Sequence, residues 1–227
     1  SSLNTGQIGF REGPLMASED SFTINVTGRQ THGSRPWNGV DPIVASSQII
    51  MATQTIASRQ VDVTKAPSVI SFGAINGGIR SNIIPDNVEL IGTIRTFDQT
   101  MRADIKKRLA KTAELVAESA GAKADVHIDH GYPVTVNNVA LTQKMTPTLA
   151  RIAGADNIIT TDLITGAEDF SYYALETPGL FYFLGVTPKD QNAKTAASNH
   201  SPQFYVDESA LQLGVESLSQ LVVDYLQ

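Results

Sequence analysis

Two histidines in this sequence stand where an imidazole could do chemistry. His32 follows a short alternating strand and is flanked by Gly33, Ser34 and Pro36, residues that hold a loop open and expose the side chain on it. His200 ends a second loop, in front of Ser-Pro. Imidazole transfers protons near neutral pH and is the commonest metal-ligating side chain. Because most isolated loop histidines are merely solvated, position alone assigns neither residue a role.

The other titratable residues form no recognisable metal-binding motif. A zinc site takes three or four protein ligands, and the sequence contains no cysteine, no His-x-His and no His-x-x-x-His pair. His127 and His130 lie in a predicted strand whose alternation turns His127 toward solvent. Glu168 and Asp169 could ligate a metal or act as acid and base, but we expect them to cap the helix that follows.

Composition excludes several classes of partner. The net charge is −6 and no run of Lys or Arg occurs, which argues against nucleic acid and acidic membranes. No apolar run approaches the ~18 residues of a membrane span. The lack of cysteine rules out disulfides and thiolate nucleophiles within this chain and leaves the compartment open. There is no Gly-x-Ser-x-Gly motif of a serine hydrolase, and Asn76-Gly77-Gly78 is typical of a turn, not of a phosphate loop.

His32, Asn82 and Arg95 must be positioned by the regular block that contains them. The elements predicted there are strand Ser21–Thr27, helix Ile43–Ile56, strands Ser68–Ala74 and Val88–Thr96, helix Thr100–Ala120 and strand Ala124–His130. Asp41 and Pro42 supply an N-cap and a first helical residue. Strand–helix–strand occurs twice within about 110 residues, a pattern that predicts a two-layer α/β sandwich.

The C-terminal block has more helix and fewer strands. We expect helix Val139–Ala153, strand Asn157–Thr160, a short helix, strand Leu180–Val186 and a final helix capped by Asp207. The apolar residues in register along the final helix are Leu211, Val215, Leu218, Val222 and Tyr225. Even with a short strand at Ile8–Phe10, these strands are too few to form a complete sheet sandwich by themselves.

A series of short motifs runs along the chain in a fixed order. They are Gly28…His32-Gly33-Ser34…Pro36, Gly77-Gly78…Asn82-Ile83-Ile84-Pro85-Asp86, Gly92-Thr93…Arg95-Thr96-Phe97-Asp98, Gly166…Glu168-Asp169-Phe170, Pro178-Gly179, Leu184-Gly185 and His200-Ser201-Pro202…Asp207-Glu208. In order and spacing this series resembles the dinuclear-zinc amidohydrolase and peptidase family. That family includes aminoacylase, glutamate carboxypeptidase, hippurate hydrolase and the plant hydrolases that release auxin from amino-acid conjugates.

The resemblance implies a fold and an assembly. The implied class is α/β (α+β): a two-layer sandwich lid domain, residues 18–130, inserted in an incomplete α/β zinc-hydrolase catalytic domain, residues 1–17 and 131–227. The lid of the family is also its dimerisation domain. The resemblance therefore implies a homodimer formed through the lid.

The resemblance also implies roles for individual residues. His32 matches the lid histidine that reaches the partner subunit's active site and steadies the oxyanion of the tetrahedral intermediate. Asn82 and Arg95 match the residues that hold the substrate's amide and carboxylate, and the planar fork of arginine suits a carboxylate. Thr165 and Gly166 match a loop that lines the pocket.

His200 matches the family's C-terminal metal ligand. The implied cofactor is two divalent ions, zinc with manganese or cobalt as alternatives. In the family the remaining ligands, and the glutamate that activates the metal-bound water, lie upstream of Gly6, and none of them is present in this chain.

We therefore expect part of a metal-dependent hydrolase that cleaves the amide bond of N-acyl amino acids or similar peptide-like substrates. The N-terminal catalytic half is missing, so we expect no activity from this chain alone. The alternative is a non-catalytic dimerisation module. The acyl group, the amino acid and the metal are left open by the sequence.

Overall fold

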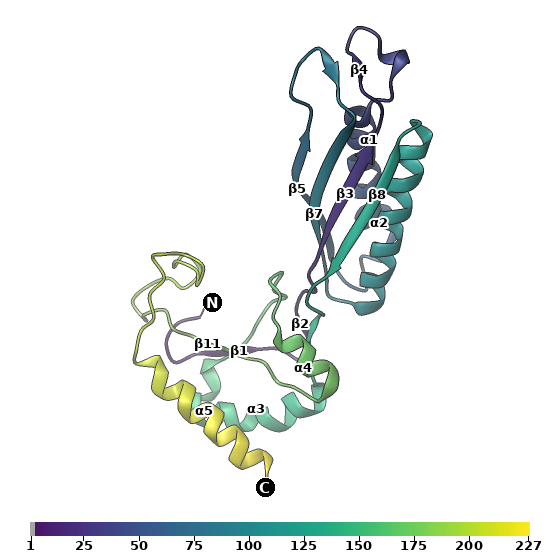
Figure 1. The fold of residues 1–227 in the computed structure, drawn as a ribbon. Coiled ribbons are helices and arrows are strands. Elements are labelled where there is room, and N and C mark those ends of the chain that lie inside the picture. The colour runs from purple at the N-terminus through teal and green to yellow at the C-terminus, as the bar shows by residue number, and fades with distance from the viewer. Residues whose placement is uncertain (1–2) are drawn as a thin grey trace. The chain divides into compact units, whose positions relative to one another are not determined.

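A computed structural model describes residues 3–227, which mix helices and strands as the sequence predicts (Figure 1). The chain forms two units. Unit 1 comprises Ser1–Leu15, Thr135–Ile164 and Asp169–Gln227, and unit 2 comprises Met16–Val134 and Thr165–Glu168. Among the described residues, no helix combines the length and apolar character needed to cross a membrane.

Unit 2 is built on a four-stranded antiparallel sheet. Its strands are β3 (Asp20–Thr27), β5 (Ser68–Gly77), β7 (Asn87–Thr96) and β8 (Lys123–His130), in the order β5-β7-β3-β8. Alternate residues are buried along β3 and β7, the pattern of a sheet covered on one face. β5 runs three residues beyond the predicted strand. The turn expected at Asn76-Gly77 is therefore the end of a strand paired with β7.

Two helices cover one face of this sheet. They are α1 (Pro42–Thr55), continued by a π-helical turn (Ile56–Gln60), and α2 (Gln99–Ser119). α1 begins as predicted, because the Asp41 carboxylate accepts hydrogen bonds from the first backbone N–H groups of the helix at 2.9 and 3.2 Å. α2 begins in the same way, with the Asp98 carboxylate accepting from the N–H of Met101 at 2.7 Å.

The helices and the sheet enclose one hydrophobic core. α1 and α2 lie side by side on the same face of the sheet (Figure 1). The fully buried residues include Phe22, Ile24, Ile49, Leu90, Ile94, Ile105 and Leu109. Burying each such side chain contributes roughly 1.5–3 kcal/mol. The two-layer sandwich expected from the sequence is the fold of this unit.

A two-stranded ribbon extends unit 2 beyond the end of the sheet where β7 begins. β4 (Thr31–His32) pairs with β6 (Ile83–Ile84), and a 3-10 turn (Pro36–Asn38) follows β4 (Figure 1). At Gly28, where the chain enters the ribbon, a Cβ atom would lie 2.3 Å from the carbonyl oxygen of Val40, so only glycine fits. We call residues 28–40 and 78–86 the tip of unit 2.

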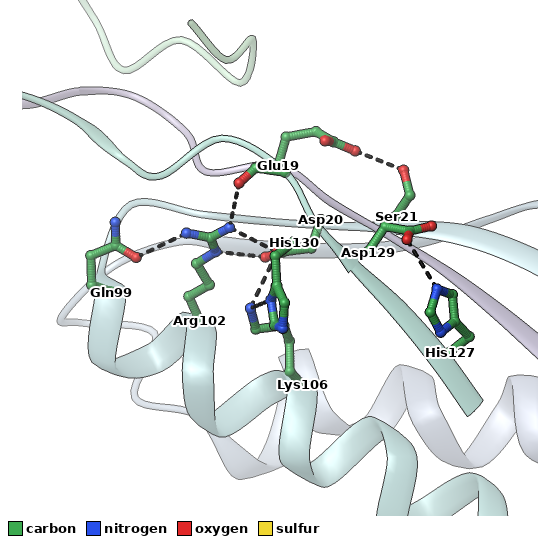
Figure 2. Close-up of polar contacts among 10 residues, drawn as sticks. Glu19, Asp20, Ser21, Gln99, Arg102, Lys106, His127, Asp129 and His130 are labelled. Carbon is green, nitrogen blue, oxygen red and sulfur yellow. Dashed lines mark hydrogen bonds and ion pairs between the residues drawn. The ribbon is translucent and has the colours of Figure 1, made fainter. Parts of the chain in front are cut away.

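A buried ion cluster holds the opposite end of the sheet, which we call the base (Figure 2). Asp20, the first residue of β3, is fully buried. Arg102 of α2 donates to both of its carboxylate oxygens, at 2.7 and 2.8 Å, and Lys106 donates to one at 3.2 Å. Arg102 also donates to the carbonyl oxygen of Gly131, directly after β8, at 2.9 Å. The cluster therefore ties the ends of β3 and β8 to α2.

Unit 1 has shorter strands and a smaller core. β1 (Ile8–Phe10), β10 (Ile158–Thr160) and β11 (Phe183–Leu184) form a sheet in the order β10-β1-β11, and β2 (Gly13–Met16) pairs with β9 (Thr135–Asn137). The helices are α3 (Val139–Ala153), α4 (Phe170–Glu176) and α5 (Ala210–Tyr225), with a 3-10 turn (Ala155–Asn157) after α3. Ile8, Phe10 and Leu149 form the buried centre of this unit.

The strand predicted at Leu180–Val186 is wrong in length, because only β11 is formed. The Asn137 side chain hydrogen-bonds to the backbone N–H and carbonyl oxygen of Phe181. In a longer strand these two groups would pair with a neighbouring strand. The Asn137 Oδ1 accepts from the Phe181 N–H at 2.7 Å, and its Nδ2 donates to the Phe181 carbonyl oxygen at 2.8 Å.

The caps predicted from Asp207 and Asp169 are not made. Asp207 lies before the first turn of α5, and its carboxylate instead accepts from the N–H and hydroxyl of Ser209 at 3.0 and 2.7 Å. Asp169 occupies the N-cap position of α4, but its side chain accepts no capping hydrogen bond. In both helices the N-cap residue already has helical backbone angles. This conformation points its side chain away from the free N–H groups of the first helical turn.

The apolar face predicted for α5 is exposed in the structure. The side that packs against the rest of unit 1 is a different one, and it includes Ala210, Leu213, Ser217 and Leu221. Small residues on that side let the helix approach the sheet closely. A search for regularly spaced large apolar residues does not identify such a side as the packed one.

Candidate functional site

His32 lies at the exposed tip of unit 2 with one ring nitrogen already engaged. Its Nδ1 accepts a hydrogen bond from the backbone N–H of Ser34 at 3.1 Å and lies 2.8 Å from the Ser34 hydroxyl. A ring nitrogen that accepts from an N–H carries no proton, so the neutral imidazole bears its proton on Nε2. The turn therefore holds His32 as a hydrogen-bond donor through Nε2. Sequence reasoning missed this role of Ser34, although the His-x-Ser spacing in a turn is the signal for it.

Asn82 lies beside His32 at the tip. The backbone N–H of Gly33 donates to the carbonyl oxygen of Asn82 at 2.7 Å, and His32 is the register partner of Ile83 in the β4–β6 ribbon. A Cβ atom at Gly33 would lie 3.2 Å from the Asn82 backbone, a tight contact that glycine avoids. The structure thus brings together two of the residues singled out from the sequence.

The tip carries more positive than negative charge, although the whole chain is acidic. Arg29, Arg35 and Arg80 are exposed there, against the carboxylates of Asp41 and Asp86 at the edge of the tip. A cationic surface around a hydrogen-bond donor favours a ligand that is, or becomes, negatively charged.

Arg95 lies at the other end of unit 2, next to the base. It stands near the end of β7, opposite Val69 of β5, on the sheet face away from the helices. One of its guanidinium N–H groups donates to the carbonyl oxygen of Thr165 at 3.3 Å. Thr165 and Gly166 belong to the short segment that is grouped with unit 2. Arg95, Thr165 and Gly166 therefore form a second group.

The two groups lie too far apart to share a small substrate within one chain. β7 is regular from position 87, which lies beside the tip, to position 95. At a rise of ~3.3 Å per residue, this length of strand separates the two groups by about 26 Å. An N-acyl amino acid is comparable in length to two residues, roughly 7 Å. A single copy of unit 2 cannot place His32 and Arg95 on the same molecule.

His200 is exposed in unit 1, beside a turn in which the N–H of Ser201 donates to the carbonyl oxygen of Ser198 at 2.9 Å. Between residues 3 and 227, no group of three or more His, Asp or Glu side chains is arranged to hold a metal ion. The residues present therefore offer one candidate ligand and do not make a metal centre.

The remaining histidines are surface residues, and for His127 this is the orientation that the strand alternation predicts. His127 projects from the outer face of β8 and pairs with the exposed Asp129 through a 3.0 Å contact (Figure 2). His130 is largely exposed beside the base, and its Nδ1 lies 2.8 Å from the ammonium nitrogen of Lys106. Both are accounted for by local contacts.

Comparison with known proteins finds similarity over the whole chain. Residues 20–121 match the family model described as a peptidase dimerisation domain. The chain is 36% identical to thermostable carboxypeptidase 2 of Saccharolobus solfataricus, over 99% of this chain and 56% of that protein. It is 37% identical to N-acetyl-L-cysteine deacetylase of Bacillus subtilis, over 92% of this chain and 48% of that protein.

A solved structure shows the same relationship. The YXEP protein of Bacillus subtilis, described as a dinuclear metal binding peptidase of the M20 family, aligns with a TM-score of 0.74 and 29% identity, covering 97% of this chain and 53% of that one. This chain thus spans about half the length of the relatives that it matches.

Proposed function

From the premise that this chain carries the peptidase dimerisation domain of the M20 family, we propose that it is part of a hydrolase that cleaves the amide bond of N-acyl amino acids or similar peptide-like substrates. In this proposal unit 2 is the lid and unit 1 is the C-terminal part of the catalytic domain. The similarity to carboxypeptidase and deacetylase relatives extends over nearly the whole chain, and not only over residues 20–121. This extent favours the hydrolase over a free-standing dimerisation module.

The observation that carries the proposal is the separation of the two groups of site residues. Because β7 holds His32 and Asn82 about 26 Å from Arg95, one substrate molecule can meet both groups only if they come from different chains. We therefore assign His32 and Asn82 of one subunit, and Arg95 with the Thr165–Gly166 segment of the other, to one composite site. A two-fold dimer would hold two such sites.

The tip group suits stabilisation of developing negative charge. As the acyl carbon becomes tetrahedral, its oxygen gains charge that a fixed donor stabilises more than it stabilises the ground-state carbonyl. His32 presents Nε2–H in an orientation set by Ser34. Asn82 would donate its amide to the same part of the substrate, and the neighbouring arginines would favour the anionic form.

The base group suits recognition of a carboxylate. A guanidinium offers five N–H donors in a planar fork and binds a carboxylate through two of them. Arg95 uses one N–H on the Thr165 carbonyl oxygen. That contact would orient the fork while other N–H groups take the free carboxylate of the amino-acid part of the substrate.

The metal belongs to the part of the enzyme outside this chain. His200 would be one ligand of a divalent ion, with zinc the first choice and manganese or cobalt as alternatives. Because the described residues supply no metal-binding cluster, the other ligands must come from elsewhere, and this chain alone would be inactive.

The proposed dimer uses the α1 and β5 side of unit 2. β5 is an edge strand, and edge strands readily pair with another chain. Ile43, Val44 and Met51 of α1 are exposed, the last of them by 72%. Exposed apolar side chains beside an open strand edge are typical of an association surface.

A substrate panel tests the proposed function. The complete hydrolase should cleave N-acetyl amino acids and discriminate against the same compounds with an amidated carboxyl group. Arg95→Ala should raise KM and remove that discrimination, because it removes carboxylate binding in ground and transition states alike. Equal turnover of free and amidated substrates by the unmodified enzyme would contradict the assignment.

A further inference from the structure

Two side chains of opposite charge lie opposite each other on the outer face of the sheet, at the base of unit 2. The pairing of β3 with β7 continues one step before β3, where the Ser18 N–H donates to the carbonyl oxygen of Thr96 at 2.8 Å. This register places Glu19 opposite Arg95. Asp20, the next residue, is buried on the helix side of the sheet, so Glu19 points to the outer face, as Arg95 does. Directly opposite residues of such a pair have Cβ atoms about 5 Å apart.

These two charged side chains do not pair with each other. Among the described residues, no ion pair joins Glu19 and Arg95. Arg95 donates to the carbonyl oxygen of Thr165 at 3.3 Å. The Glu19 carboxylate accepts from the Ser21 hydroxyl at 2.9 Å, on the face of the sheet away from Arg102 (Figure 2). Each charge is thus held by a neutral group, and the two charges stay apart.

Gly131 allows the Glu19 carboxylate to lean away from Arg95. A Cβ atom at Gly131 would lie 2.2 Å from one oxygen of that carboxylate. Gly131 directly follows β8, which flanks β3 on the side away from β7. The carboxylate therefore occupies the space above a residue without a side chain. The N–H groups of Arg95 that are not used on Thr165 stay open to a ligand.

The neighbouring carboxylates at the base are engaged by basic side chains. Asp20 pairs with Arg102 at 2.7 Å, and Asp129 contacts His127 at 3.0 Å. Glu19 forms no such pair with any cation in the part of the chain that the structure describes, and it is partly exposed. A free carboxylate one strand away from a carboxylate-binding guanidinium favours a ligand that carries both charges.

We infer that Glu19 selects substrates whose amino-acid part has a basic side chain, an inference that rests on the proposed function. In the composite site Arg95 takes the carboxylate, and the amide meets the tip group of the other subunit. The side chain is the remaining substituent on the same carbon, so it can extend along the sheet toward Glu19. A lysine or arginine side chain is long enough to span the ~4.8 Å between neighbouring strands. On the other side of Arg95 its register partner is the uncharged Val69.

The test compares three substrates of the complete hydrolase: Nα-acetyl-lysine, Nα-acetyl-norleucine, which has a similar chain without the ammonium group, and Nα-acetyl-glutamate. We expect kcat/KM to be highest for the lysine compound and lowest for the glutamate compound, whose second carboxylate Glu19 repels. Glu19→Gln keeps the shape and an oxygen for Ser21. It should lower the lysine-to-norleucine ratio of kcat/KM by about fivefold, the effect of losing one partly exposed ion pair.

The matched control is Asp125→Asn, which removes an exposed carboxylate from the outer face of β8, six residues before Gly131. It should leave the lysine-to-norleucine ratio unchanged. An unchanged ratio in Glu19→Gln would overturn the inference. So would an equal loss for the lysine and norleucine compounds, which would assign Glu19 to the amide that both share. Because Glu19 is partly exposed, Glu19→Gln should keep Tm within about 2 °C of the unmodified protein.

Binding to the 227-residue chain separates this inference from the proposed function, because the chain itself contains Glu19 and Arg95. In an NMR titration Nα-acetyl-lysine should bind more tightly than Nα-acetyl-norleucine, and Glu19→Gln should remove the difference. Equal binding of the two compounds by the unmodified chain would overturn the inference. A complete enzyme that hydrolyses no N-acetyl amino acid, while its chain still prefers the lysine compound, would contradict the proposed function and leave the selectivity of Glu19 in place.

Discussion

The backbone N–H of Gly33 donates to the carbonyl oxygen of Asn82 at 2.7 Å, and this bond makes the loop around His32 and the start of β6 one structural group. Both side chains therefore act from the same end of unit 2. Arg95 is anchored to Thr165 at the other end. The proposed division of the candidate site between two chains rests on this arrangement of β4, β6 and β7.

The first prediction concerns His32 in the complete hydrolase. If Nε2–H acts on the oxyanion, His32→Ala should lower kcat and kcat/KM together by about 10²–10³, the scale for loss of one oxyanion-hole donor. Steady-state kinetics with an N-acetyl amino acid measures this. The matched control is His127→Ala, which removes an exposed histidine of the same unit and should leave both constants unchanged. A His32→Ala variant that alters KM alone would contradict a transition-state role.

The second prediction concerns the buried cluster at the base. Asp20→Asn leaves the Arg102 guanidinium without its charged partner while keeping the shape of the side chain. Breaking a buried pair from one side costs about 3–5 kcal/mol, so the free energy of unfolding in urea should fall by that order. Asp129→Asn, which alters an exposed pair of the same sheet, should change it by less than about 0.5 kcal/mol. Equal effects of the two variants would show that the Asp20 cluster does not hold the base.

The third prediction concerns acid stability through Asp98. The backbone N–H of Met101, with a smaller contribution from Lys65, lowers the pKa of Asp98 below its ordinary value of 3.8. A carboxyl whose pKa is lower in the folded state stabilises the fold above its unfolded pKa, and this contribution is lost as pH falls through the folded pKa. Asp98→Asn keeps a capping oxygen but does not titrate.

The difference in Tm between the unmodified chain and Asp98→Asn should therefore be constant above about pH 5 and shrink as the pH drops below 3.8. Thermal unfolding by circular dichroism across that range measures it. Parallel curves for the two proteins down to the lowest pH would show that capping by Asp98 is not charge-dependent.

The fourth prediction concerns assembly. If α1 and the β5 edge form the dimer contact, Met51→Lys should shift the 227-residue chain from dimer toward monomer, because it places a charge in an apolar interface. Sedimentation velocity at tens of micromolar distinguishes the two states. Leu115→Lys alters an exposed apolar residue of α2 and should leave the dimer intact. A chain that sediments as a monomer before any substitution would contradict self-association through unit 2.

The sequence predicts unit 2 well because its signals are local. Alternating burial defines β3 and β7, and Asp41 marks the start of α1, without reference to any distant partner. The same reasoning fails where tertiary contacts decide the outcome. Asn137 shortens β11 from more than forty residues away in sequence. On α5, periodicity finds an apolar face but cannot show which side a neighbour covers.

The candidate site shows the same limit. Asn82 and Arg95 are close in sequence, which suggests proximity. The extended backbone of β7 instead carries Arg95 toward the base while a short ribbon keeps Asn82 beside His32. Residue types and order single out these residues as candidates, but their division into two groups requires the strand geometry.

The composite site is tested most directly by mixing two impaired subunits of the complete hydrolase, His32→Ala and Arg95→Ala, and measuring hydrolysis at substrate concentrations well below KM, where both defects lower the rate. In a heterodimer one site receives the intact His32 of one subunit and the intact Arg95 of the other, while the second site receives both defects. Random pairing should therefore restore about a quarter of the unmodified activity, because half of the dimers are mixed and each has one good site of two. A mixture that shows only the summed activity of its parents, although native mass spectrometry shows heterodimers, would establish that His32 and Arg95 act within one chain and contradict the account.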